Sequence, residues 1–232
     1  MEGLPPRRRL GAGRLADSVR IAAISRNPGV LDSRSEVLFP RGVTLVAGSR
    51  LTLEEFLRLD ETEPYSEYAC GEVLQKPMPD RAHSAIQFFL AAVLFPFLSR
   101  TGIGRGFTEF RCIFGPPGGQ RAYVPDLTYV AMEHLTDDRY LRMAPDLAVE
   151  ILSHDQDMAR FVDKIQFYLG HGVRLVWVID PTRATIAVLV PGQDARVLTI
   201  GNTLDGGEVL PGFSVPVADI FAQVSTTTTS GD

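Results

Sequence analysis

The sequence predicts an α/β domain with a mixed central sheet flanked by helices. Two segments show the three- and four-residue apolar spacing of helices, and short β-prone segments lie between and after them. Residues 175–179 are almost continuously apolar, which is typical of a strand covered on both faces. The sequence shows no internal repeat, so a single domain accounts for the pattern.

Composition divides the 232 residues into three parts. Residues 1–48 are rich in Arg, Gly and Pro without a sustained period, which predicts a disordered extension. The simpler interpretation is a segment without function, and the alternative is a basic arm that touches nucleic acid. Residues 49–224 hold the predicted domain, and residues 225–232 form a polar, flexible tail.

Capping and turn signals predict the first elements of the domain. Thr52 and Glu55 fit a capping box that opens a short helix. Residues 67–69 and 72–75 can pair as a hairpin around Cys70 and Gly71. Asp80 can cap a long helix through residue 98, with these residues facing inward: Ile86, Phe89, Leu90, Val93 and Leu94.

The second half alternates strands with one more helix. Strands are predicted over these segments: 107–114, 124–130, 147–152, 175–179, 185–189 and 195–200. A helix over 155–171 carries an apolar stripe of Phe161, Ile165, Tyr168 and Leu169, with Lys164 beside it. Residues 213–222 close the domain.

Composition also excludes some classes of protein. The longest apolar stretch, 85–98, contains Gln87 and Pro96 and is too short to cross a bilayer, so we expect a buried helix and no membrane partner. Cys70 and Cys112 are the only cysteines, so no disulfide framework is implied and a reduced, cytoplasmic setting is expected.

Charge is distributed unevenly along the chain. Residues 1–50 carry nine arginines and four acidic residues, whereas residues 51–232 carry 14 basic and 24 acidic residues. An acidic domain disfavours general, tight DNA binding, which needs phosphate neutralisation. Lys76 and Lys164 are the only lysines, so a lysine close to the acidic motifs is suggestive.

Two carboxylates interrupt the β-prone stretches of the predicted sheet. Asp126 lies within residues 123–130 and Glu150 within residues 146–153. An ionised carboxylate is costly in an apolar strand unless it is paired, solvated or bound to a cation. A hard divalent cation relieves the repulsion between two such groups, and Lys164 supplies a complementary charge. The pattern indicates metal-assisted cleavage of a phosphodiester.

The chain from Leu51 to Ala222 resembles the Uma-type family of restriction-type endonucleases, within the PD-(D/E)XK nuclease-like superfamily. The resemblance rests on the order and spacing of these residues: Glu67-Tyr68-Ala69-Cys70-Gly71-Glu72, His83, Pro125-Asp126, Glu150, Lys164 with Tyr168, Gly172-Val173, Trp177-Val178-Ile179-Asp180-Pro181 and Pro211-Gly212-Phe213-Ser214-Val215-Pro216. It implies a restriction-endonuclease-like fold.

The sequence departs from the family pattern at three positions. In the wider fold a lysine usually follows the glutamate by two residues, where this chain has Leu152. The resemblance implies that Lys164 on the next helix takes that role. Arg160 and Cys70 stand where the family tends to carry aspartates, so the surroundings of the site differ from the family pattern.

The resemblance and the residue types together predict the site. Asp126, Glu150 and the backbone carbonyl of Ile151 would hold Mg²⁺ or Mn²⁺, and Lys164 would assist the attacking water. The resemblance also implies that an acid of the hairpin completes the metal site or orients Lys164, and Glu72 is placed above Glu67 for this role. His83 could contact a phosphate. The alternatives are ordinary exposed strand ends for the acids and a surface position for Lys164, Glu72 and His83.

The leading interpretation is a metal-dependent endonuclease that hydrolyses phosphodiester bonds in DNA. Cleavage of both strands of a duplex usually needs two active sites, so a homodimer is expected, with residues 185–200 as a candidate interface. Two other interpretations stay open. One is an interaction module that keeps the fold without catalysis, and the other is hydrolysis of another phosphate ester by the same metal chemistry.

Overall fold

The computed structural model describes residues 50–224 and, before them, the backbone of two short strands, β1 (Glu36–Leu38) and β2 (Thr44–Val46). These strands pair antiparallel, with Val37 opposite Leu45, so part of the segment 1–48 has regular structure where the sequence predicted none. Their β-branched residues favour an extended backbone. The rest of that segment and the predicted tail at 225–232 lie outside the described residues.

The central sheet has six strands in the order β12-β11-β10-β9-β8-β5. The strands are β5 (Gly104–Thr108), β8 (Leu127–Ala131), β9 (Leu147–Ile151), β10 (Leu175–Asp180), β11 (Thr185–Leu189) and β12 (Arg196–Leu198). β9 and β10 run parallel, whereas every other neighbouring pair in this sheet is antiparallel. The prediction of a mixed sheet flanked by helices is confirmed.

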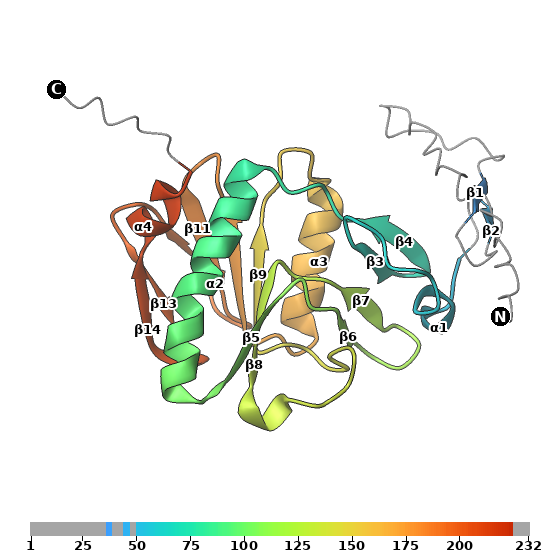
Figure 1. The fold of residues 1–232 in the computed structure, drawn as a ribbon, viewed down its shortest axis with the longest axis horizontal. Coiled ribbons are helices and arrows are strands. Elements are labelled where there is room, and N and C mark those ends of the chain that lie inside the picture. Colours follow the sequence, from blue (N-terminus) through green and yellow to red (C-terminus); the bar gives the residue numbers. More distant parts are fainter. Residues whose placement is uncertain (1–35, 39–43, 47–49, 225–232) are drawn as a thin grey trace, which may run out of the picture.

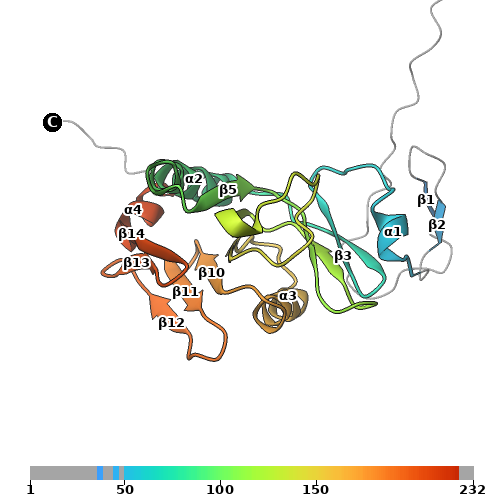
Figure 2. The ribbon, with the colours of Figure 1, turned by 90° about the horizontal axis from the view of Figure 1, so that it is seen from below.

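Helices cover both faces of this sheet (Figure 1). α2 (Arg81–Thr101) lies on one face together with α4 (Val217–Ala222) and the hairpin of β13 (Thr203–Gly206) and β14 (Leu210–Pro216). α3 (Met158–Gly170) covers the other face, and the turned view in Figure 2 shows α2 and α3 on opposite sides.

Strand alternation decides which residues of β9 face each helix. Leu147, Val149 and Ile151 pack in the core cluster of α2, and Ala148 packs in the cluster of α3. Because side chains alternate between the faces of a strand, Glu150 points to the α3 side, where Lys164 is also buried.

A second, four-stranded sheet has the order β4-β3-β7-β6. Its strands are β3 (Ser66–Ala69), β4 (Glu72–Gln75), β6 (Cys112–Phe114) and β7 (Arg121–Tyr123). The predicted hairpin is present, with a two-residue turn in which Cys70 and Gly71 have φ angles of 53° and 87°. Such turns match the twist of antiparallel strands and need positive φ at both positions.

The predicted helix caps are also present. Thr52 and Glu55 form a capping box before α1 (Leu53–Phe56), and Asp80 caps α2 by accepting from the backbone N–H of His83. α2 is longer than the predicted apolar stretch, and by length and composition alone it could cross a membrane. Its inner residues Ile86, Leu90 and Leu94 pack in the core.

Several features differ from the predicted elements, and β7 is one strand that was not predicted. Glu109 has a φ of 51° and ends β5, so the strand predicted over 107–114 is two strands that belong to different sheets. β13 was not predicted, because Thr203–Gly206 has only one fully buried apolar residue, Leu204. A short 3₁₀ helix, η1 (Met132–His134), follows β8.

Candidate active site

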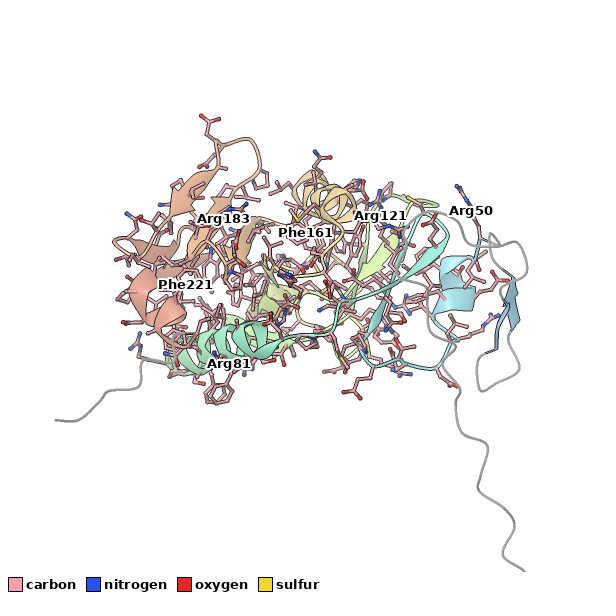
Figure 3. All side chains as sticks on the ribbon, turned by 90° about the horizontal axis from the view of Figure 1, so that it is seen from above. Arg50, Arg81, Arg121, Phe161, Arg183 and Phe221 are labelled. Atoms are coloured by element: carbon pink, nitrogen blue, oxygen red, sulfur yellow. The ribbon has the colours of Figure 1, made fainter. Side chains whose placement is uncertain are left out.

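A cavity of about 820 Å³ opens between the β3–β4 hairpin, the ends of β8 and β9, and α3. Several ionisable side chains line it, among them Glu67, Lys76, His83, Asp126, Glu150 and Lys164. All of these except Lys76 are among the buried polar residues, and the side chain of Lys76 is only 11% exposed. Figure 3 shows the side chains of this region, with Phe161 labelled on α3 at one wall of the cavity.

The strand register brings Asp126 and Glu150 together. β8 and β9 are antiparallel with Leu127 opposite Val149, so continuing the register by one residue places Asp126 opposite Glu150. The backbone N–H of Ile151 donates to Oδ2 of Asp126 at 2.7 Å, which fixes the carboxylate at the end of β9. Ile151 therefore contributes its amide to this pair and also lines the cavity.

Glu150 and Lys164 make the first half of the site. Nζ of Lys164 lies 2.7 Å from Oε1 of Glu150 and donates to Oε1 of Glu67 at 2.8 Å. The hydroxyl of Tyr168, one turn after Lys164, donates to Oε1 of Glu150 at 2.7 Å. Glu67 also accepts from the backbone N–H of Val124 at 2.9 Å.

Burial and charge together shift the pKa values of Glu150 and Lys164. It raises the pKa of Glu150 to about 7 because the charged form loses its water, although the Lys164 ammonium opposes the shift. The charges of Asp126 and Glu67 add to the increase. Burial would lower the pKa of Lys164, but the carboxylates of Glu150 and Glu67 outweigh it and keep that pKa above its ordinary value.

Asp126 and Lys76 make the second half of the site. Nζ of Lys76 donates to Oδ1 of Asp126 at 2.8 Å, to Oε2 of Glu109 at 3.0 Å and to the carbonyl of Val124 at 2.8 Å. Nε2 of His83 lies 3.1 Å from Oδ2 of Asp126. Burial alone would raise the pKa of Asp126, but Lys76 and then His83 hold it well below its usual range.

Sequence reasoning did not identify Lys76 or Glu109 as site residues. Lys76 follows β4 and is 50 residues before Asp126, so no local motif connects them. Glu109 accepts from Nε2 of Gln87 at 3.1 Å as well, and Gln87 also donates to the carbonyl of Asp126. The available signal was composition, because both lysines of the chain lie in this pocket.

The remaining predicted residues divide between the interior and the rim. Glu72 lies on β4 with its side chain 55% exposed, 3.5 Å from Arg160, whereas Glu67 on β3 is buried against Lys164. Both acids lie on the same face of the hairpin, since Glu72 is opposite Ala69, but Glu72 lies next to the turn and Glu67 lies deeper, beside Lys164. His83 is buried, and its Nδ1 has no hydrogen-bond partner among the described residues.

The sequence predicted two repelling carboxylates and one lysine. The structure instead pairs each carboxylate with a lysine of its own. Within the described part of the chain, no three His, Cys, Asp or Glu side chains form a ready-made metal centre. Four carboxylates nevertheless surround the two ammonium groups: Glu67, Glu109, Asp126 and Glu150. When all four are ionised, two negative charges are in excess, so the donor type and the charge fit a hard divalent cation.

Known proteins give an independent comparison. The Uma2 family, described as putative restriction endonucleases, matches residues 53–218. A crystal structure of a putative nuclease belonging to DUF820 from Anabaena variabilis ATCC 29413 has a TM-score of 0.70 and 33% sequence identity, covering 75% of this chain and 99% of that chain. No curated protein matches the chain. The resemblance predicted from the sequence and the restriction-endonuclease-like fold are confirmed, and the chain belongs to the Uma2 family of putative restriction endonucleases.

Proposed function

We propose that this protein is a divalent-metal-dependent endonuclease that hydrolyses phosphodiester bonds in DNA. The observation that carries the proposal is the buried cluster of four carboxylates and two lysines in one cavity of about 820 Å³. Buried clusters with strongly shifted pKa values concentrate at functional sites. Membership of the family supports a nucleic acid as the substrate.

Asp126 and Glu150 would hold Mg²⁺ or Mn²⁺, because carboxylate oxygens are the ligands that these ions prefer. When bound, the ion would supply Lewis-acid stabilisation for the negative charge that develops on the phosphate. Lys76 and Lys164 compensate only part of the negative charge in the cavity. A divalent ion brings the remaining positive charge.

Lys164 is the proposed catalytic cation of the protein itself. Its ammonium contacts Glu67 and Glu150, and an ammonium has three donors, so one donor is left for a substrate oxygen or the attacking water. Tyr168 and Glu67 act as positioning residues, since they fix Glu150 and Lys164 through hydrogen bonds of 2.7 and 2.8 Å. Glu150, with a pKa of about 7, is suited to take up a proton near neutral pH.

Cleavage of supercoiled plasmid with Mg²⁺ or Mn²⁺ tests this proposal. The variant Glu150→Gln is the sharpest probe, because burial already favours the neutral form of this side chain and an amide of the same shape should fold. We expect activity to fall by about 100-fold or more, and EDTA to stop the wild-type reaction. Glu133→Gln, an exposed glutamate on η1, is the matched control and should keep wild-type activity.

Two results would contradict the proposal. Glu150→Gln protein that cleaves as fast as the wild type would remove Glu150 from the site. Absence of cleavage on supercoiled, linear and single-stranded DNA would leave two alternatives, an interaction module or hydrolysis of another phosphate ester. A panel of small phosphodiesters with Mn²⁺ separates these alternatives, because only the second predicts turnover.

We also propose that the protein acts as a homodimer, since each described chain carries one such pocket and a duplex has two strands. The candidate surface is the edge strand β12, where Val197 within the strand and Ile200 just after it are 63% and 61% exposed. Charged substitution of both residues should then yield a monomer by sedimentation velocity. A wild-type monomer at high micromolar concentration would refute the dimer.

A further inference from the structure

The Lys76 ammonium occupies a position whose surroundings suit a metal ion. Its three oxygen partners are the carboxylates of Asp126 and Glu109 and the backbone carbonyl of Val124, at 2.8 to 3.0 Å. Carboxylate and carbonyl oxygens are also the ligands of hard divalent cations. Burial would lower the pKa of Lys76, but the carboxylates of Asp126 and Glu109, and then those of Glu150 and Glu67, raise it.

All three donors of this ammonium are in use. A protonated lysine has three N–H groups, and Lys76 directs one to each of the three oxygens. Lys76 therefore has no donor left for a phosphate while it stays in place. Its role in this arrangement is to neutralise the carboxylates of Asp126 and Glu109, which it contacts at 2.8 and 3.0 Å.

We propose that Lys76 is a tethered counter-ion that holds the cation position at Asp126, and that a divalent metal ion binds there by displacing it. This inference rests on the proposed metal-dependent function and adds a step to it. The measured free energy of metal binding would then be the difference between the binding free energies of the metal ion and of the ammonium, which compete for the same oxygens. The tethered ammonium weakens metal binding, and in the metal-free protein it reduces the repulsion between the carboxylates of Asp126 and Glu109.

The position of Lys76 in the chain makes displacement feasible. It follows the last residue of β4 and precedes Pro77, Met78 and Pro79, a segment that lines the mouth of the cavity. Met78 is 68% exposed, so this segment lies at the surface. Rotation about the side-chain bonds of a lysine can withdraw its ammonium into the cavity while the backbone N–H keeps its 3.0 Å bond to Tyr65.

Lys164 is not suited to the same exchange. Its side chain is 8% exposed, and its ammonium lies 5.4 and 5.8 Å from the ring centres of Tyr123 and Tyr168. These aromatic rings and the two carboxylates enclose it on helix α3. The two lysine side chains are almost equally buried, at 8% and 11% exposure, so the difference lies in their attachment. Lys164 is fixed on a helix beside two aromatic rings, whereas Lys76 belongs to a segment at the surface.

Titration calorimetry with Mn²⁺ alone, without DNA, tests the exchange on the full chain. We expect Lys76→Met, which keeps an unbranched side chain but removes the ammonium, to bind Mn²⁺ about tenfold more tightly, equivalent to about 1.4 kcal/mol. Arg160→Met is the matched control, because it removes a cation at the rim of the same cavity. The control should bind Mn²⁺ within about twofold of the wild type if the effect requires a shared position.

The outcomes separate this inference from the proposed function. Equal or weaker binding by Lys76→Met, with measurable binding by the wild type, overturns the exchange and leaves the metal-dependent function intact. A similar gain in the Arg160→Met control also overturns it, because general charge would then explain the result. Failure of both the wild type and Lys76→Met to bind Mn²⁺ overturns the metal-dependent function and the exchange together.

Wild-type crystals soaked in MnCl₂ give a test that does not depend on the folding of a variant. We expect an anomalous peak beside Oδ1 of Asp126, with the Lys76 ammonium withdrawn from its three oxygens. A manganese ion bound at Asp126 or Glu150 while Lys76 keeps its contacts to Asp126 and Glu109 would overturn the exchange. Diffraction therefore decides the same question without a substitution.

Discussion

Each half of the pocket pairs a buried carboxylate with a lysine, but the pKa of the carboxyl group is lowered in one half and raised in the other. Asp126 receives hydrogen bonds from Lys76 and from the Ile151 amide and lies beside His83, and its pKa is held well below its usual range. Glu150 contacts Lys164 and Tyr168, but burial dominates and raises its pKa to about 7. For Asp126 the combined effect of Lys76 and His83 on the pKa outweighs burial, whereas for Glu150 the effect of Lys164 does not.

The largest expected effect comes from removing Lys164, because both of its carboxylate partners are buried, whereas Glu109 beside Lys76 is 27% exposed. Lys164→Met leaves Glu67 and Glu150 buried without their cation, which typically costs 3–5 kcal/mol, although protonation of Glu150 reduces the loss. Urea unfolding at pH 8 measures it. We expect a smaller loss for Lys76→Met, because Asp126 keeps the Ile151 amide and His83. An equal or larger loss for Lys76→Met would mean that the burial of the carboxylate partners does not decide the cost.

The opposite pKa shifts predict opposite pH dependence. Glu150 has a folded pKa of about 7 against an ordinary value of 4.5, so between these values the folded protein keeps a proton that the unfolded chain releases. Stability therefore falls as the pH rises from about 4.5 to 7, by on the order of 3 kcal/mol. Glu150→Gln should remove this slope in urea unfolding at pH 5, 6, 7 and 8. A variant that keeps the wild-type slope would contradict the assignment.

Ionisation of Asp126 should make the folded protein more stable as the pH rises, the opposite of the effect of Glu150. Its folded pKa lies below the ordinary value of 3.8, so its contribution to stability is present above that pH and is lost as the pH falls through the folded value. Acid unfolding of Asp126→Asn should therefore be less steep below pH 4 than that of the wild type. Identical acid slopes in both proteins would show that other carboxylates control acid unfolding.

A smaller effect is expected at His83. Its Nε2 lies 3.1 Å from Asp126, and a side-chain hydrogen bond to a charged partner contributes about 1.5–3 kcal/mol at most. We expect His83→Leu to lose about 1–2 kcal/mol in urea unfolding, because Lys76 and the Ile151 amide still hold the carboxylate. His154→Leu, on an exposed loop, is the control and should stay near the wild type. No loss at His83 would place the histidine outside the Asp126 half.

The smallest effect is expected at the rim. Glu72 is 55% exposed and lies 3.5 Å from Arg160, a geometry that contributes within about 0.5 kcal/mol. Glu72→Gln should therefore change the urea midpoint little, whereas Glu67→Gln should lower it clearly because Lys164 loses a buried partner. A larger loss at Glu72 than at Glu67 would reverse the positions that the structure gives these two acids.

Local signals predicted much of the fold. The capping box at Thr52 and Glu55, the Asp80 cap and the Cys70-Gly71 turn depend on neighbouring residues, so the sequence reveals them directly. The break at Glu109 was not predictable in this way. Its positive φ coincides with contacts to Lys76 and Gln87, which are distant in the sequence and become visible only in the folded chain.

The site was predictable where residues lie in regular elements. Alternation along β9 and spacing on α3 place Glu150 and Lys164 on facing surfaces, and the structure brings them within 2.7 Å. Lys76 belongs to no periodic segment, so neither spacing nor alternation could place it. The assignment of catalytic and metal-binding roles to these residues stays a prediction until the variants are measured.

The Glu67–Lys164 ion pair joins residues that are 97 positions apart, and the Lys76–Asp126 pair spans 50 positions. Contacts of such long range form late in folding, because the entropy of closing the intervening loops must be overcome first. A chain emerging from the ribosome therefore cannot assemble this pocket until α3 has been synthesised and docked. Any activity that depends on this pocket can therefore appear only after synthesis has passed Tyr168.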